Sequence, residues 1–233
     1  MSSRMKYYLL LVLLLPLFGC AEVSNADQLN AKIVVSNSTI NNQANNNNQK
    51  EKNNLYVFVG EKISVEEFDS RTKDNEFPMD RAFKAKYKVL QNIYGDYQKD
   101  TIEFESFDHY GSPPFAKYNT VLLFVSEYEG KLYHEKYQYF DVYKTKDGKW
   151  ASCGDPYRFD DYHRKEVELA KLEFDKPLLF DLKEFKDKYI KAVFKEPYFR
   201  VSGNKAECLT GAYIEVLFIV KKEGVLKARG LFK

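Results

Sequence analysis

The sequence lacks an excess of either charge, although charged residues are abundant. Its 233 residues include 36 Lys and Arg against 34 Asp and Glu. Arg4 and Lys6 account for the whole surplus, because residues 1–19 contain no acid. Proteins that bind nucleic acid usually present a net basic surface. The balance therefore argues against a nucleic-acid partner, and equally against an electrostatic membrane-binding face.

Histidine is scarce, and motifs of catalytic or metal-binding chemistry are missing. His109, His134 and His163 are 25 and 29 residues apart, which gives no HxH or HExxH spacing. No GxSxG or phosphate-binding glycine loop is present. We expect no cofactor and no metal and assign no catalytic residue, although ligands on distant strands could converge. Asp108 and His109 lie in a Gly/Pro loop, so the alternative is a hydrolase whose base is His109.

Cysteine is also scarce. The three residues are Cys20, Cys153 and Cys208, and none lies in a CxxC motif, which leaves a redox site without support. In an oxidising compartment the last two would pair. We therefore expect a Cys153–Cys208 disulfide that closes a loop of about 55 residues, with two buried free thiols as the alternative.

The chain begins with an apolar run that is too short to cross a bilayer. Residues 7–15 are apolar and Pro16 interrupts them, whereas a spanning helix needs about 20 such residues. Arg4 and Lys6 supply the positive charge that precedes the apolar part of a secretory signal. We therefore predict a cleaved signal peptide over residues 1–19.

The run ends in Leu17-Phe18-Gly19-Cys20, which resembles the lipobox of bacterial lipoproteins. An aliphatic residue stands three positions before the cysteine and a small one directly before it; Phe18 is bulkier than the family's usual residue. The resemblance implies that the Cys20 thiol takes a diacylglyceryl group, that cleavage precedes Cys20, and that its new amine is acylated, as with palmitate. Two or more acyl chains anchor a protein stably.

The resemblance also implies a location. The mature chain would be lipid-anchored and extracytoplasmic in a bacterial cell envelope, with the membrane as a partner through Cys20. Ala21 rather than Asp follows the cysteine. In a Gram-negative organism this favours the outer membrane, facing the periplasm.

Residues 20–54 are predicted to be a disordered tether that starts at the lipidated cysteine. Nine of the eighteen residues from 37 to 54 are Asn. Such a tract cannot bury enough apolar surface to offset the entropy of ordering it. A short apolar patch at residues 33–35 could instead dock on the domain.

Residues 55–233 are predicted to form a single β-rich domain. The expected strands cover residues 55–68, with a bulge at Gly60, and then 83–89, 101–107, 121–125 and 133–143. Gly95, Gly130 and Gly148 mark turns between strands. Short strands joined by antiparallel turns are typical of a sandwich or barrel.

The last third has a mixed pattern. Residues 166–174 are ambiguous, and we favour a strand. A helix is expected after Asp181 as its cap, with Glu184 as partner in the capping box and Pro197 as its end. A strand over residues 213–220 and its return over 225–232 would form a final hairpin.

A second resemblance concerns the first two strands. Phe58-Val59-Gly60-Glu61-Lys62, followed by residues 87–96, resembles the opening of bacterial netrin-like domains, which are similar to tissue inhibitors of metalloproteinases. Tyr94 replaces the Lys expected before Gly95, and the disulfide framework of the animal proteins is missing. The resemblance implies a mainly β fold with an OB-like antiparallel barrel of about five or more strands. The animal inhibitors chelate zinc through a free N-terminal Cys; an acylated Cys20 excludes that mechanism.

Four tyrosines form the candidate binding site. Tyr133, Tyr137, Tyr139 and Tyr143 are expected on one face of the fifth strand. Tyrosine offers a flat apolar ring and a hydroxyl, which suits sugars and proteins, and OB-type barrels bind oligosaccharides on such faces. The alternative is that these residues pack under the predicted helix.

The sequence therefore favours a lipid-anchored envelope protein that binds, or inhibits, a protein or glycan partner without catalysis. The alternatives are an envelope hydrolase with a site near His109 and a structural lipoprotein.

Overall fold

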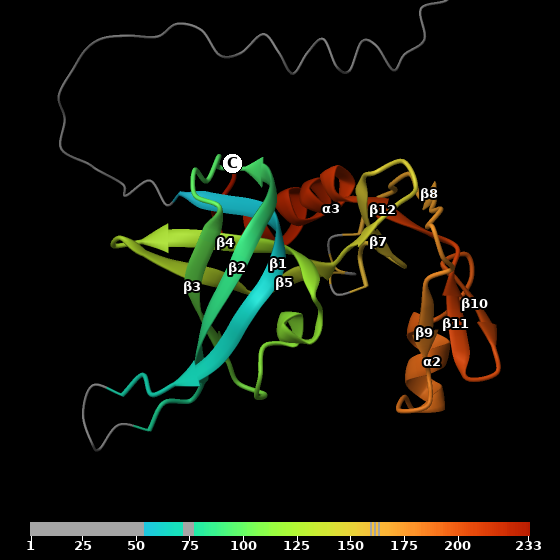
Figure 1. Ribbon diagram of the computed structural model, residues 1–233, viewed down its shortest axis with the longest axis horizontal. Helices are drawn as coiled ribbons and strands as arrows, with labels where there is room; N and C mark the ends of the chain where they lie inside the picture. Colours follow the sequence, from blue (N-terminus) through green and yellow to red (C-terminus); the bar gives the residue numbers. More distant parts are fainter. Residues whose placement is uncertain (1–53, 72–76, 159, 161, 163) are drawn as a thin grey trace, which may run out of the picture. The chain divides into compact units, whose positions relative to one another are not determined.

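The first five strands of the computed structural model form one closed sheet (Figure 1). The structure describes residues 54–71, 77–158, 160, 162 and 164–233, all within the unit Lys50–Lys233. The strands are β1 (Leu55–Phe68), β2 (Arg81–Tyr94), β3 (Thr101–Asp108), β4 (Thr120–Tyr128) and β5 (Lys131–Asp141). Their order is β1-β2-β3-β5-β4, and β1 also pairs with β4, which closes the ring. Only β3 and β5 are parallel, through the pair Glu105 and Tyr133.

The strands of the ring follow the period of two that the sequence predicts. In β2, Phe83, Ala85 and Tyr87 are buried, while the lysines between them are exposed. The register of β1 against β2 shifts at Gly60, as expected for a bulge. A Cβ at Gly60 would lie 3.0 Å from the Phe58 ring, so glycine gives the neighbouring rings their space.

The interior of the ring is aromatic. The buried cluster comprises Phe58, Ala85, Tyr87, Ile102, Phe104, Phe115, Val121, Leu123, Val125 and Tyr139. Phe115 comes from the short 3₁₀ helix η1 (Pro114–Lys117), which lies between β3 and β4 in sequence. Its ring is fully buried, with its centroid 6.1 Å from that of Phe104 and 4.6 Å from that of His134. The helix η1 therefore fills the ring with a side chain from outside the sheet.

The outer faces of β1, β4 and β5 carry a second core. Val57, Leu122 and Phe140 alternate with the residues that point inward and pack against Ile214 and Leu217 of helix α3 (Ile214–Lys221). Both faces of the first half of β1 and of most of β4 are therefore buried, which explains why these segments are apolar on both sides.

Two smaller sheets follow the ring in sequence. The first contains β6 (Tyr143–Lys144), β7 (Trp150–Cys153), β12 (Thr210–Tyr213) and β8 (Ala170–Lys171). The second contains β10 (Phe199–Ser202), β11 (Lys205–Cys208) and β9 (Leu179–Asp181), and helix α2 (Asp187–Val193) lies between β9 and β10 in the chain. The chain is thus mainly β, with a C-terminal helix.

The final hairpin that we predicted is wrong. Residues 214–221 form α3 instead of a strand, and residues 222–226 form the π-helical turn η3 (Lys222–Leu226). The sequence there is apolar on nearly all sides, and such a run does not separate helix from strand by its period. Packing decides, because Ile214, Leu217 and Val220 recur every three residues and are buried.

Two further elements are shorter than predicted. Within residues 166–174 only β8 is a strand. The helix expected from Asp181 begins only at Asp187. The Asp181 carboxylate accepts a hydrogen bond from the Lys183 backbone N–H at 3.0 Å, as an N-cap would, but the chain forms only a turn there. Leu182 is nevertheless buried in the C-terminal core.

The predicted disulfide is confirmed. Cys153 on β7 and Cys208 on β11 are bonded, with their Cα atoms 6.0 Å apart. The bond joins the two small sheets within one buried cluster that includes Leu182, Phe194 and Phe199. It therefore links residues separated by 55 positions in sequence.

Replacing both cysteines, as in Cys153→Ala/Cys208→Ala, should lower the free energy of unfolding by about 4 kcal/mol, because the unfolded chain regains the entropy of an open loop. Urea denaturation followed by circular dichroism measures this change. Reductant should lower the midpoint of the wild type and leave the double variant unchanged. Equal wild-type midpoints with and without reductant would contradict the prediction.

Candidate binding surface beside the bulge of β5

Three segments that are distant in sequence meet at one end of the ring. The His109 Nδ1 donates to the backbone oxygen of Met79 at 2.9 Å. Asp80 lies 3.5 Å from the same nitrogen and accepts a 2.5 Å hydrogen bond from the Lys136 ammonium. The loop before β2, the loop after β3 and the middle of β5 therefore form one continuous surface.

A large bulge shapes the β5 part of this surface. Leu123 pairs with Tyr139 but Val125 pairs with His134, so five steps along β5 oppose two along β4. Tyr137 has a φ of 67° within the bulge, and the His134 Nε2 donates to the backbone oxygen of Gln138 at 2.9 Å. A bulge of this kind re-aims the side chains that follow it.

A residue near the C-terminus supports the bulge from outside. The Arg229 guanidinium donates to the Glu135 carboxylate at 2.7 Å and to the backbone oxygen of Lys136 at 2.9 Å. Ser126 on β4 donates to the other Glu135 oxygen at 2.5 Å. The bulge is thus held by hydrogen bonds on both of its sides.

The bulge separates the four tyrosines, so the predicted common face is wrong. Tyr139 is 8% exposed inside the ring, where its ring centroid is 6.1 Å from that of Tyr118. Tyr133 lies half-buried against Phe107. Tyr143 belongs to β6 and packs on aromatic rings of the C-terminal core. Burial raises the pKa values of Tyr139 and Tyr143 well above the ordinary value, and only Tyr137 is left in an exposed position.

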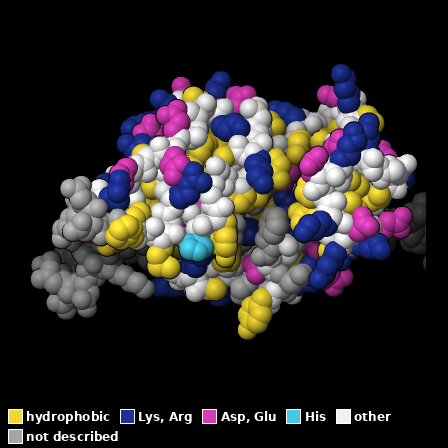
Figure 2. Space-filling model, turned by 90° about the horizontal axis from the view of Figure 1, so that it is seen from below, with side chains coloured by type: hydrophobic (Ala, Val, Ile, Leu, Met, Phe, Trp, Pro, Cys, Tyr) yellow, Lys and Arg dark blue, Asp and Glu magenta, His cyan; other side chains and the backbone are white. Residues whose placement is uncertain are grey.

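Tyr137 borders an apolar groove of about 360 Å³. The groove, called the tyrosine groove below, is lined by Tyr110, Pro114, Tyr137, Gln138 and Tyr139. The Tyr110 side chain is 86% exposed, and that of Tyr137 is 38% exposed. Figure 2, which views the molecule from below, shows hydrophobic side chains next to a histidine at the surface.

Gln138 contributes an unusual polar group beneath the groove. It is 7% exposed, and its Oε1 atom is buried without a hydrogen-bond donor among the residues that the structure describes. Its Nε2 donates to the backbone oxygen of Lys136 at 3.2 Å. A buried acceptor without a donor is costly and calls for an explanation.

The structure does not form the Asp108–His109 pair that the hydrolase alternative suggested. Asp108 is buried and accepts a 2.8 Å hydrogen bond from the Tyr110 backbone N–H, whereas His109 faces Asp80. Because His109 Nδ1 faces a carbonyl oxygen, this nitrogen carries a proton and donates it to that oxygen. The hydrogen bond from Lys136 lowers the pKa of Asp80, with a smaller contribution from His109.

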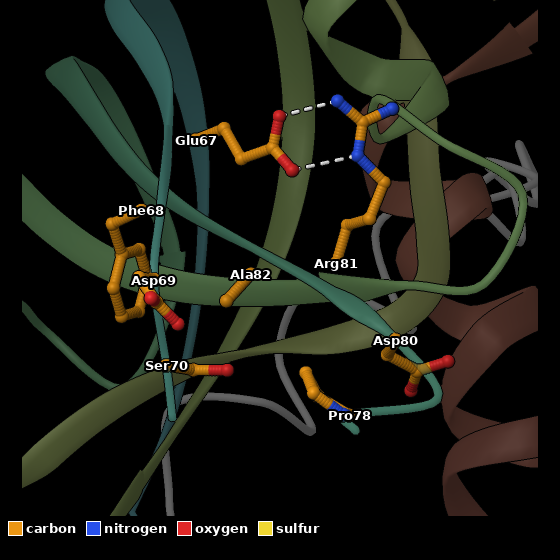
Figure 3. Close-up of a pocket in the computed structure, with 8 residues that line it drawn as sticks. All are labelled: Glu67, Phe68, Asp69, Ser70, Pro78, Asp80, Arg81 and Ala82. Atoms are coloured by element: carbon orange, nitrogen blue, oxygen red, sulfur yellow. Dashed lines mark hydrogen bonds and ion pairs between the residues drawn. The ribbon is translucent and has the colours of Figure 1, made fainter. Parts of the chain in front are cut away.

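A second groove lies beside this surface, at the ends of β1 and β2 (Figure 3). Glu67 and Arg81 point toward one another across it, and Arg81 donates to both carboxylate oxygens, Nε to Oε1 at 2.7 Å. The hydrogen bond from Arg81 lowers the pKa of Glu67. The charges of Glu67 and Arg81 in this second groove are therefore already paired. The amide oxygen of Gln138, in contrast, has no donor among the described residues.

Several predicted features lie outside the described residues. These are the signal peptide, Cys20, the tether up to residue 53, and His163. Within the described ranges, no cluster of His, Cys, Asp and Glu could hold a metal ion, and no helix is long and apolar enough to cross a membrane.

Sequence reasoning missed Tyr110, Asp80, Lys136 and Gln138. Tyr110 had a signal, because it follows His109 in the Gly/Pro loop. The other three gain their significance from contacts across the fold. Neither a family model, a curated protein nor a solved structure matches this chain.

Acid should weaken the fold through His134, which supports the bulge. Burial lowers its pKa from 6.5 to about 4, so the unfolded chain binds this proton first. The free energy of unfolding should then fall by roughly 3 kcal/mol as the pH drops from above 6.5 to 4. His134→Gln keeps a hydrogen-bond donor but has no imidazole to protonate, so it should not show this loss. Urea denaturation at a series of pH values measures the free energy of unfolding of both proteins.

A substitution away from the bulge provides the control for this experiment. Tyr128→Ala, at the exposed end of β4, should retain the pH dependence of the wild type. An unchanged difference between pH 7 and pH 4 in His134→Gln would refute the assignment.

Proposed function

We propose that this chain is a lipid-anchored cell-envelope protein whose β-rich domain binds a protein or glycan partner without catalysing a reaction. The observation that carries the proposal is the surface around the β5 bulge. There, exposed Tyr110 and Tyr137 stand beside a polar rim of His109, Asp80 and Lys136. Exposed tyrosines beside a groove are typical of recognition surfaces.

The location rests on the N-terminal sequence. Leu17, Gly19 and Cys20 match the lipobox, and the positive charges and short apolar run precede them. The Cys153–Cys208 disulfide supports this proposal, because structural disulfides persist mainly in oxidising compartments. Acyl chains on Cys20 would hold the chain at the membrane, on the outer membrane if the organism is Gram-negative.

The architecture supports an OB-like assignment for the ring, which we propose together with the netrin-like resemblance of β1 and β2. The ring has five strands in the order β1-β2-β3-β5-β4, and the long β1 pairs on both of its edges. OB-type barrels bind oligosaccharides and oligonucleotides on their surface. The balanced charge of the sequence favours a glycan or a protein over a nucleic acid.

Lipidation is tested by Cys20→Ser. Cells that express the wild type should incorporate labelled palmitate into the protein, and the protein should sediment with membranes. The variant has no thiol at residue 20 and should lose the label and accumulate as uncleaved precursor. Labelling of the variant at the wild-type level would exclude Cys20 as the acylated residue.

Partner binding is tested by crosslinking in cells, followed by purification of the full-length protein. Tyr110→Ala/Tyr137→Ala should reduce recovery of a specific partner at least tenfold, because the variant removes both exposed rings. Tyr128→Ala is the matched control, since Tyr128 is 48% exposed at the far end of β4. A partner that both variants retain equally would place recognition elsewhere.

The same experiment addresses the hydrolase alternative. His109→Ala should lower partner recovery less than Tyr110→Ala/Tyr137→Ala does, because it removes one group of the polar rim and keeps both exposed tyrosine rings. Loss of a hydrolytic activity in His109→Ala, with folding preserved, would overturn the non-enzymatic assignment.

A further inference from the structure

The bulge residues Lys136, Tyr137 and Gln138 combine three uncommon features. Tyr137 has a left-handed backbone. Its aromatic ring is partly exposed over an apolar groove. Gln138 buries an amide oxygen without a donor among the described residues. Backbone strain and unsatisfied polar groups tend to gather at functional sites.

The backbone at Tyr137 points to selection for its side chain. At a φ of 67° glycine or asparagine is favoured, and a bulky aromatic residue is rare. The Lys136 ammonium lies 5.4 Å from the centroid of the Tyr137 ring. The ring is therefore held at the surface instead of joining the aromatic interior.

The orientation of the Gln138 amide follows from its one hydrogen bond. Nε2 faces the backbone oxygen of Lys136 at 3.2 Å, and a flipped amide would bring two acceptors together there. The atom that has no donor within the described part of the chain is therefore the oxygen, which can accept from an N–H or O–H group. Because this oxygen is buried, a ligand reaches it only with a local side-chain rearrangement.

We propose that the tyrosine groove binds a 2-acetamido sugar, with the sugar ring stacked on Tyr137. The amide N–H of the acetamido group would donate to Gln138 Oε1, and its methyl would lie on the apolar wall formed by Pro114 and Tyr139. The acetamido group thus offers one N–H donor and one methyl group, and the groove offers one acceptor oxygen and an apolar wall. The inference rests on the proposed binding function and names its ligand class.

The charges around the groove favour a neutral ligand. Lys136 and Asp80 are paired at 2.5 Å, so neither offers an unmatched charge to a strongly ionic group. Their remaining hydrogen-bonding positions, together with Nε2 of His109, suit sugar hydroxyls at the rim. The groove volume of about 360 Å³ is in the range of small-ligand sites.

The test uses full-length protein in detergent and two soluble probes, tetra-N-acetylchitotetraose and cellotetraose. Saturation-transfer NMR should show the strongest transfer at the acetyl methyl protons. Titration calorimetry should give at least tenfold weaker binding of cellotetraose. Equal affinity for the two probes, or no binding of the acetylated one, would overturn the acetamido-sugar assignment.

Variants separate recognition from folding. Tyr137→Asn suits the left-handed backbone, so its thermal midpoint should be at least that of the wild type while affinity falls tenfold or more. Gln138→Met removes the amide and should abolish the preference for the acetylated probe. Tyr128→Ala should bind as the wild type does. Wild-type affinity in Tyr137→Asn would exclude stacking on that ring.

The outcome for the sugar is distinguishable from the outcome for the proposed function. If Tyr110→Ala/Tyr137→Ala loses a crosslinked protein partner while neither probe binds, the binding module stands and the sugar ligand is wrong. If the double variant also keeps every partner, both proposals fail.

Discussion

The bulge in β5 is the constraint on which the rest of the structure depends. Before the bulge, His134 faces the interior of the ring; after it, Tyr139 faces inward and Phe140 outward. A regular strand would have sent Phe140 inward with His134, because side chains alternate with a period of two. The extra residues therefore let one strand close the aromatic ring and also supply the outer core against α3. They also leave Tyr137 at the surface.

Buried charged groups surround the end of β5, after the bulge. Asp141 is paired with Arg158, which also donates to the backbone oxygen of Cys153 at 3.1 Å. Lys221 of α3 is 2% exposed, lies 5.0 Å from the centroid of the Phe140 ring, and has its pKa lowered by burial to about 8. Buried charges stabilise a fold weakly but are costly to separate. We therefore expect these charged groups to contribute little to the free energy of unfolding. Their main effect is to fix the position of β5 relative to the segments of Arg158 and Lys221.

The sequence predicts the ring well because its strands carry local signals. Alternating residues such as Phe83 and Lys84 give the period, and glycines such as Gly130 mark the turns. The C-terminal part was mispredicted because residues 214–220 are apolar on nearly all sides, so packing against β1, β4 and β5 selects the helix. The tyrosine face failed for a different reason. A bulge changes the side to which each later residue points, and residues 134–139 carry no glycine to announce it.

The sequence also does not reveal which residues the fold brings together at the candidate site. Tyr137 and the loop of His109 were separate candidates in the sequence, and the structure joins them through Asp80 and Lys136. In the groove at Glu67 and Arg81 these two opposite charges are paired. The bulge instead contains Tyr137 with a left-handed backbone conformation, and the amide oxygen of Gln138, which has no donor among the residues that the structure describes. A chain selected for stability alone would relieve both with a glycine and an apolar residue. Because both features lie at an exposed groove, they are the structural basis of the binding that we propose.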